Sequence, residues 1–460
     1  MPSSITAVNP ETATKTQWRS VSWLSALLGP AILSWWILGS YFGVDVFATL
    51  SFWGADGWCQ TPQEGLGSHC FGDYAAIRFE SILQPAVGPE SVYPLSTRFI
   101  RIVPWSVGQL LGFQAGLIVF MVICIIALLI PSFWAASKVH GYSRPTVVLT
   151  TAIATVPFIS LLDRGQILAL AVPFLFGFMF FIIRNRPEIA VICLVVATAI
   201  KPQFAILVLV FLVFRYWLPG LLALLGVGAV VAVPYLLMGI EGLSAFRGWL
   251  TSAHSWSQSV PLSSEYPINL SFASNARRVV EYLHSYVSEN DQLDKGSSSI
   301  LGLTDSFYNS LIQGAVLIAL IILILFGRNL SRLVLISAIL AISFFVLPIA
   351  FVYYSAIALP IAALIFRSPE DSKVEKNGHL GRESTARYFL VIAVVTTLSP
   401  LIIPISSPVE GEPVLNLMPL AASVAWMLFV IATCFTAFVS WVGFRRSSKF
   451  QKVVLVEEIK

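Results

Sequence analysis

The chain has 460 residues, of which 57% are hydrophobic and only 11% charged, with a formal net charge of +4. Soluble domains carry about 25% charged residues, so this chain has too little polar surface to cover a globule in water. The composition excludes a soluble protein and predicts an all-α polytopic membrane protein. No nucleic-acid partner is expected.

Residues 1–20 are polar and lack the features of a signal peptide, so they are expected to form a cytoplasmic tail. The apolar runs that follow predict about twelve transmembrane helices, since a span needs roughly 20 apolar residues. The runs at 188–200 and 351–366 are short, and tilted, broken or partly re-entrant helices are expected there. The runs lie near 21–42, 106–133, 145–161, 166–183, 188–200, 204–218, 220–240, 308–327, 331–348, 351–366, 387–405 and 418–444.

The distribution of lysine and arginine predicts that both termini are cytoplasmic. With twelve spans, nineteen of the 28 basic residues fall on the inner face, and most of the others fall in two long outer segments. These outer segments are residues 43–105 and 241–307 of a transmembrane domain that covers residues 21–444. A cytoplasmic linker is expected at 367–387 and a basic cytoplasmic tail at 445–460.

The first outer segment holds the most conspicuous group of polar side chains. Asp73 begins the sequence DYAAIRFESIL, whose apolar spacing predicts an interfacial amphipathic helix with the carboxylate at its start. The carboxylate is interpreted as a catalytic base, with helix capping as the simpler alternative and Asp45 as the second candidate base. Cys59 and Cys70 form a possible disulfide if the segment faces an oxidising compartment; two free thiols are the alternative.

Two charged turns interrupt the apolar pattern, Asp163-Arg164-Gly165-Gln166 and Lys201-Pro202-Gln203. In the predicted topology both turns lie at the outer surface, the same side as Asp73. Charges at a membrane boundary are costly, which favours a functional reading. Ordinary hairpin turns with a self-neutralising Asp–Arg pair are the alternative for either turn alone. Together, the turns favour a pocket that binds an anion and contains a carboxylate.

These pieces resemble the polyprenyl-phosphate-sugar-dependent glycosyltransferases of the GT-C superfamily, most closely the actinobacterial α-mannosyltransferase and arabinofuranosyltransferase branch. The resemblance covers the order of elements over about 350 residues. The family often has a histidine where this chain has Val352, and the insert with Cys59 and Cys70 is a second departure. The matching pieces are Gly72-Asp73-Tyr74-Ala75-Ala76, Tyr93-Pro94-Leu95, Asp163-Arg164-Gly165-Gln166, Ala199-Ile200-Lys201-Pro202-Gln203 and Tyr353-Tyr354.

The resemblance implies an inverting transfer from a polyprenyl-phosphate sugar in the outer leaflet to an envelope glycolipid or polysaccharide. It makes Asp73 the base that takes the proton of the acceptor hydroxyl. The groups expected at the donor phosphate are Lys201, Arg164, Arg78, Gln166 and Gln203. The aromatic side chains expected along the substrate groove are Tyr74, Tyr93, Tyr353 and Tyr354, with an interfacial aromatic belt as the alternative for the last two.

Mannose is ranked before arabinofuranose as the sugar, because it is the commoner use in that branch. No cofactor is expected, and transfer is predicted to be independent of metal because no cluster of carboxylates suggests a divalent site. A transporter or flippase of a lipid-linked sugar is the competing class. It predicts ionisable groups near the membrane midplane, whereas the ionisable residues here gather at one surface.

Overall fold

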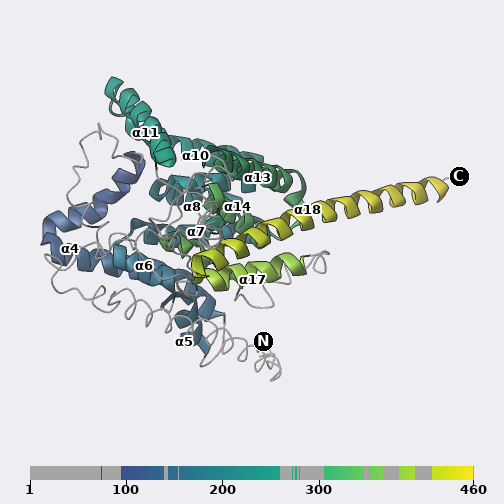
Figure 1. Ribbon diagram of the computed structural model, residues 1–460, viewed down its shortest axis with the longest axis horizontal. Coiled ribbons are helices and arrows are strands. Elements are labelled where there is room, and N and C mark those ends of the chain that lie inside the picture. The colour runs from purple at the N-terminus through teal and green to yellow at the C-terminus, as the bar shows by residue number, and fades with distance from the viewer. Residues whose placement is uncertain are drawn as a thin grey trace, which may run out of the picture.

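The structure is a computed structural model that describes residues 74, 95–138, 143–153, 155–259, 272, 275–276, 279, 305–346, 352–365, 383–398 and 417–458. In this part of the chain all elements are helices and no strand occurs, which confirms the all-α class (Figure 1). The α-helices are α4 (Leu95–Ser137), α5 (Ser143–Val148), α6 (Val156–Arg164), α7 (Val172–Ile183), α8 (Pro187–Ile200), α9 (Val208–Val213), α10 (Trp217–Leu236), α11 (Ile240–Ser259), α13 (Asp305–Phe326), α14 (Arg332–Val346), α15 (Ala358–Ile365), α17 (Ser384–Leu398) and α18 (Leu417–Glu458). A π-helical turn, η1 (Leu149–Ile153), and four 3₁₀ segments, η2 (Ile167–Ala171), η3 (Pro202–Leu207), η4 (Gly327–Asn329) and η5 (Val352–Ile357), connect them.

Three helices in the described part of the chain are long and apolar enough to cross a bilayer by themselves: Gln114–Ser137, Trp217–Leu236 and Leu420–Val442. The other apolar helices have 10–17 residues, fewer than the roughly 20 of a straight crossing. They include Pro187–Ile200 and Tyr354–Ile365, which overlap the two runs that the sequence marks as short, 188–200 and 351–366. The first predicted run, 21–42, lies outside the described residues, so the count of twelve spans stays a prediction.

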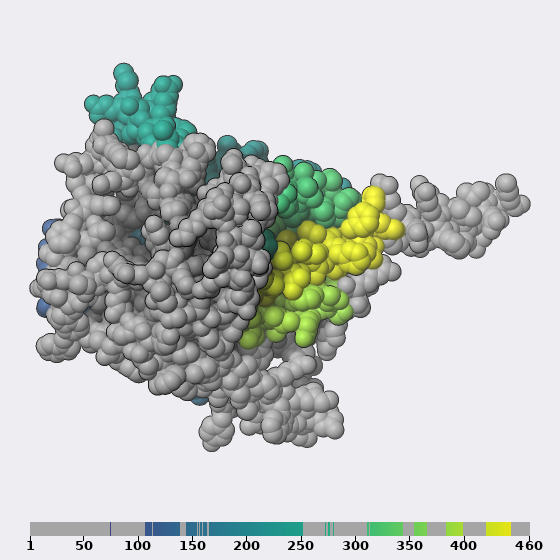
Figure 2. Space-filling model, in the orientation of Figure 1, coloured from purple at the N-terminus to yellow at the C-terminus, as the bar shows by residue number. Residues whose placement is uncertain are grey.

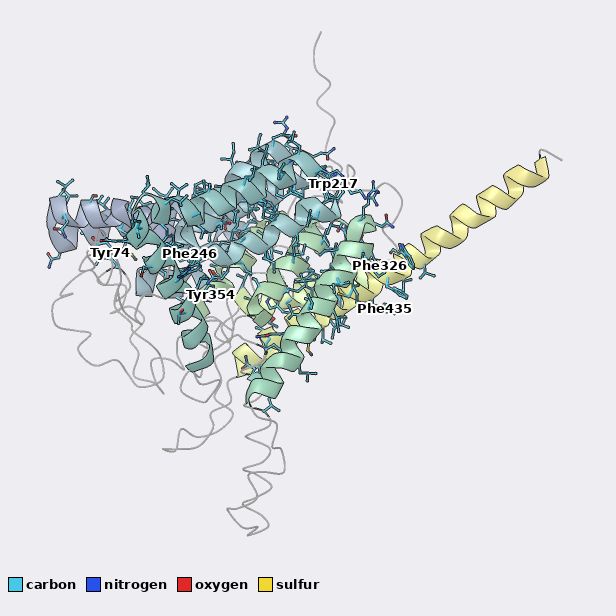
Figure 3. The ribbon with its side chains drawn as sticks, turned by 90° about the horizontal axis from the view of Figure 1, so that it is seen from above. Tyr74, Trp217, Phe246, Phe326, Tyr354 and Phe435 are labelled. Carbon is cyan, nitrogen blue, oxygen red and sulfur yellow. The ribbon has the colours of Figure 1, made fainter. Side chains whose placement is uncertain are left out.

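Large apolar side chains cover the outside of the described helices. Trp217 on α10 is 66% exposed and Phe435 on α18 is 68% exposed (Figure 3). Helices α13, α17 and α18 lie side by side on one face (Figure 2), where α18 packs against both of the others. Contiguous apolar surface of this kind is rare on soluble monomers, and it indicates helices that face lipid.

Helix α4 folds back on itself at Gly112 (Figure 1). Gly112 has φ 78° and ψ 171°, a conformation that glycine adopts without the steric cost of a Cβ. The two arms then come so close that a Cβ on Gly116 would lie 2.6 Å from the Cα of Gly108. One arm therefore continues the predicted first outer segment, and the other forms the span Gln114–Ser137.

The core of the bundle is built from α7, α14 and α15. Helix α15 packs against α4, α7 and α17, and α14 packs against α7, α13 and α18. Leu175 of α7, Leu335 of α14 and Ile361 of α15 are completely buried. Because these helices are apolar on all sides, sequence periodicity does not mark their inward faces, as expected for helices inside a membrane bundle.

Helices α7 and α8 form an antiparallel hairpin whose turn is closed by Asn185. The N–H of Arg186 donates to the Phe181 carbonyl at 2.8 Å, and the N–H of Asn185 donates to the Ile182 carbonyl at 3.1 Å. This is the Schellman arrangement of a helix C-terminus. Asn185 has φ 60°, a left-handed conformation that asparagine tolerates better than most residues.

Arg332, the first residue of α14, holds the closed end of this hairpin. Its guanidinium donates to the carbonyls of Ile182 at 2.9 Å and Ile183 at 3.1 Å, and to Asn185 Oδ1 at 3.0 Å. Tyr216 also donates to Asn185 Oδ1, at 2.5 Å. A single cation thus satisfies the last carbonyls of α7, where its charge also complements the helix dipole.

The beginnings of α14 and α17 are joined by the buried carboxylate of Glu383. Its Oε1 accepts the N–H of Ser331 at 2.6 Å, and its Oε2 lies 3.4 Å from Arg387 Nε. A carboxylate at two helix N-termini is favoured by their unpaired N–H groups and their dipoles. This contact also fixes the start of α17 at Ser384, slightly before the predicted apolar run at 387–405.

Replacing Arg332 with alanine should lower the unfolding temperature of the purified protein. It removes three hydrogen bonds from a charged donor, each worth about 1.5–3 kcal/mol, and we expect a net loss of about 2–3 kcal/mol after water replaces part of them. Arg328→Ala is the matched control, because Arg328 is an exposed arginine in the neighbouring segment η4. Equal unfolding temperatures for the two variants would show that the Arg332 contacts do not stabilise the hairpin.

Candidate active site

The α7–α8 hairpin brings the two predicted charged turns to the same end of the bundle. Gln166 directly precedes η2 and α7, and Lys201 directly follows α8, so both lie at the end opposite Asn185. Segment η5, which contains Tyr353 and Tyr354, packs against α6 and η2, and η2 packs against α8. Three sequence pieces that are far apart in the chain therefore form one group.

The first turn is a helix end built on Gly165. Gly165 has φ 63° and ψ 40°, and its N–H donates to the Leu162 carbonyl at 3.0 Å. The N–H of Gln166 donates to the Leu161 carbonyl at 2.9 Å, which completes a Schellman motif. The left-handed glycine reverses the chain immediately after Arg164. Gln166, which follows, is only 4% exposed.

Lys201 is the most unusual side chain of this group. Its backbone is extended, with φ −141° and ψ 109°, because Pro202 disfavours the helical conformation at the residue before it. Only 1% of the side chain is exposed, and its Nζ lies 5.5 Å from the ring centroid of Tyr354. Lysine is almost never fully buried unless its charge is compensated, and the face of an aromatic ring supplies part of that compensation.

Gln203, two residues after Lys201, has a buried Oε1 that accepts no hydrogen bond from the described part of the chain. A buried acceptor without a donor costs about 1–3 kcal/mol, a cost that a bound hydroxyl would remove. Gln203 belongs to η3, which packs between α8 and α14. The group therefore offers a cation, an aromatic face and an amide acceptor, which are side chains suited to a phosphate and a sugar.

Tyr74, the residue after Asp73 in the sequence, packs against α4. Tyr74 lies beside α4 (Figure 3) and is completely buried. Its ring stacks on Phe120 of α4 at 5.2 Å between centroids. Its hydroxyl approaches Gly116 so closely that a Cβ there would lie 2.6 Å from it. Helix α4 also packs against η2, which follows Gln166. The buried ring suits an anchoring role better than the predicted groove role.

Several predicted site residues lie outside the described part of the chain: Asp45, Cys59, Cys70, Asp73, Arg78 and Tyr93. For Asp163, Arg164 and Tyr353 the structure describes the backbone, in α6 and η5, and not the side chain. The residues that the structure does bring together are thus Gln166, Lys201, Gln203 and Tyr354, with Tyr74 on the adjoining helix α4.

The sequence reasoning missed two kinds of residue. Gly108, Gly112 and Gly116 allow α4 to fold back on itself. In the sequence they are recognisable as three glycines at intervals of four residues within one apolar run. Asn275 was overlooked in the second predicted outer segment, where it is 3% exposed, and Phe272 of the same segment packs against the hydrophobic core. No periodic pattern distinguishes these two positions from the polar residues around them.

The described residues contain no group of three or more histidine, cysteine, aspartate or glutamate side chains that would hold a metal ion. Cys124, Cys193 and Cys434 are free thiols within the apolar helices. The described side chains of this region that could meet a ligand are amides, an ammonium group and aromatic rings.

Comparison with known proteins gives one result. The family model described as Glycosyltransferase family 87 matches residues 93–351, which is more than half of the chain. The match includes both charged turns and the α7–α8 hairpin, begins after Asp73 and ends just before Tyr353. No curated protein and no solved structure matches the chain significantly.

Replacing Gly116 with alanine should destabilise the protein, because the new Cβ meets both Gly108 Cα and the Tyr74 hydroxyl. Overpacking of this kind costs about 1–3 kcal/mol, which thermal unfolding of the purified protein would measure. Gly228→Ala on α10 is the control, since Gly228 is exposed with nothing within 4 Å of the added Cβ. That variant should be neutral or slightly more stable, because alanine favours a helix over glycine.

Tyr74→Phe provides a second test of the same contact. It keeps the stacked ring and removes the hydroxyl, so the double variant Tyr74→Phe/Gly116→Ala should recover part of the stability lost in Gly116→Ala. A double variant whose losses simply add would show that the hydroxyl and Gly116 do not touch.

Proposed function

The chain belongs to glycosyltransferase family 87, and from this premise we propose that it transfers mannose from a polyprenyl-phosphate donor to an envelope glycolipid or polysaccharide. The reaction takes place at the outer face of the cell membrane, at the end of the bundle that contains Gln166 and Lys201. The observation that carries the proposal is the buried Lys201 ammonium beside the Tyr354 ring. A buried cation suits a ligand whose negatively charged group, such as a phosphate, enters the protein.

The proposed reaction is an inverting displacement at the anomeric carbon. The acceptor hydroxyl oxygen forms the new bond to this carbon, and the bond from the carbon to the phosphate oxygen breaks with its electron pair going to the phosphate. The hydroxyl proton moves to the carboxylate of Asp73, acting as general base. Polyprenyl phosphate leaves with the additional negative charge.

Lys201 is the proposed partner of that leaving phosphate, with Arg164 and Arg78 as further cations. A fixed cation in a site without water stabilises charge that develops in the transition state, and needs no rearrangement to do so. Gln166 and Gln203 supply amide groups for hydrogen bonds to the donor, and Tyr353, Tyr354 and Tyr93 are proposed to line the groove. No metal or cofactor is part of the proposal.

Tyr74 is proposed to position the base. It is the neighbour of Asp73 in the chain and is fixed by Phe120 and Gly116 of α4. A side chain held by stacking and close packing restricts the backbone next to it. The proposed role of Tyr74 is to extend this restriction to the neighbouring Asp73.

Asp73→Asn should lower sugar transfer by a factor of about 10²–10⁴, the usual contribution of a general base. The measurement is incorporation of label from polyprenyl-phosphate mannose, and separately from polyprenyl-phosphate arabinofuranose, into an envelope extract containing EDTA. Asp45→Asn is the comparison variant and should retain activity. Full activity in Asp73→Asn with loss in Asp45→Asn would transfer the role of base to Asp45.

The two donors also test the choice of sugar. Incorporation of mannose alone supports the proposed donor, and incorporation of arabinofuranose alone would replace it while leaving the mechanism intact. If folded protein uses neither donor, yet moves a lipid-linked sugar across a vesicle membrane, the enzyme proposal is wrong and the chain is a transporter.

Lys201→Met should lower the transfer rate by a factor of about 10² or more, because the charge at the leaving phosphate is lost while the apolar stem is kept. Lys138→Met is a matched control. Lys138 also places its Nζ over an aromatic ring, 5.6 Å from the Trp134 centroid, but is exposed. Thermal unfolding confirms that both variants fold, and equal rates for the two would remove Lys201 from the phosphate site.

A further inference from the structure

A groove of about 640 Å³ lies between α4 and the α5–η1 segment, away from the candidate active site. Its walls are apolar, with Phe133 and Ala136 on α4 and Val148 and Ile153 on the opposite side. The two polar side chains among the described residues that line it are Ser137 and Arg144, at one end. The π-helical turn η1 forms part of the wall, and such turns widen a helix locally.

One end of the groove lies where the apolar span of α4 ends. This span ends at Ser137, which lines the groove, and the next residue, Lys138, is exposed and lies over Trp134. Tryptophan and basic side chains gather at the level of the lipid headgroups. We therefore expect Arg144 at headgroup level and Ile153 deeper in the bilayer.

The length of the groove fits one leaflet. Residues 144–153 rise by at most about 14 Å at the α-helical 1.5 Å per residue, and a leaflet contributes about half of the roughly 30 Å hydrocarbon core. The exposed Phe133 side chain, at 56%, shows that the wall is open toward lipid. An extended hydrocarbon chain entering from Arg144 would remain within this leaflet.

We propose that this groove binds one acyl chain of an anionic phospholipid, with the Arg144 guanidinium on the phosphate. Arginine presents two parallel donors that match a phosphate, and it is less strongly hydrated than lysine. The distribution of basic residues predicts that this end of α4 is cytoplasmic, and anionic lipids are enriched in the cytoplasmic leaflet. The site is independent of the proposed sugar transfer, since it lies at the other end of α4 from Tyr74.

The test uses the full-length protein reconstituted in nanodiscs of equal parts phosphatidylglycerol and phosphatidylcholine. Lipids that stay bound after transfer to detergent are counted by native mass spectrometry. We expect wild-type protein to retain phosphatidylglycerol over phosphatidylcholine by about fivefold, the factor that one basic side chain contributes at a lipid surface. Arg144→Gln should bring the ratio close to one.

One control variant tests for general charge effects, and two filling variants test the apolar part of the groove. Arg328→Gln, which removes an exposed arginine of η4 outside the groove, should keep the wild-type ratio. Val148→Phe should fill the apolar part of the groove and reduce retention of both lipids. Ala136→Val fills the groove less and takes the place of Val148→Phe if that variant does not fold. An unchanged ratio in Arg144→Gln, an equal loss in Arg328→Gln, or full retention in both filling variants would overturn the proposal.

Discussion

Every helix end in this chain must satisfy its own polar groups, because lipid offers no hydrogen bonds in place of water. The described structure meets this constraint in three ways. Residues in the left-handed conformation, such as Gly165 and Asn185, direct the N–H groups that follow a helix back to carbonyls in its last turn. Arg332 donates to the end of α7, and Glu383 accepts from the start of α14. These closures allow helices much shorter than a bilayer to remain inside the bundle.

The same constraint bears on how two of the described basic residues are placed. Arg332 is half-buried and uses its charge to close a helix, so its role is structural. Lys201 directly follows α8, where its N–H donates to the Ala197 carbonyl at 2.9 Å and its buried ammonium lies 5.5 Å from the centroid of the Tyr354 ring. This ring belongs to the group at the end of the bundle that also contains Gln166. The proposed phosphate role is based on this placement.

Part of this arrangement can be predicted from the sequence, and there are physical reasons why the rest cannot. The composition gave the all-helical membrane class, and Gly165 and Pro202 marked two turns that the α7–α8 hairpin does place at one end. The position of η5 beside α6 depends on long-range packing of apolar surfaces that have no distinguishing period. The buried state of Tyr74 depends on glycines in another helix, and no local pattern reports such a contact.

The length of α8 also limits how close Lys201 can lie to the membrane surface. Helix α8 has 14 residues and reaches at most about 21 Å, whereas the hydrocarbon core is about 30 Å thick. If the closed end at Asn185 lies at one polar boundary, the ammonium of Lys201 falls several ångströms short of the other. A phosphate that meets Lys201 must therefore sink below the headgroup plane, away from bulk water. In the proposed reaction this recess would protect the activated sugar from hydrolysis until the acceptor arrives.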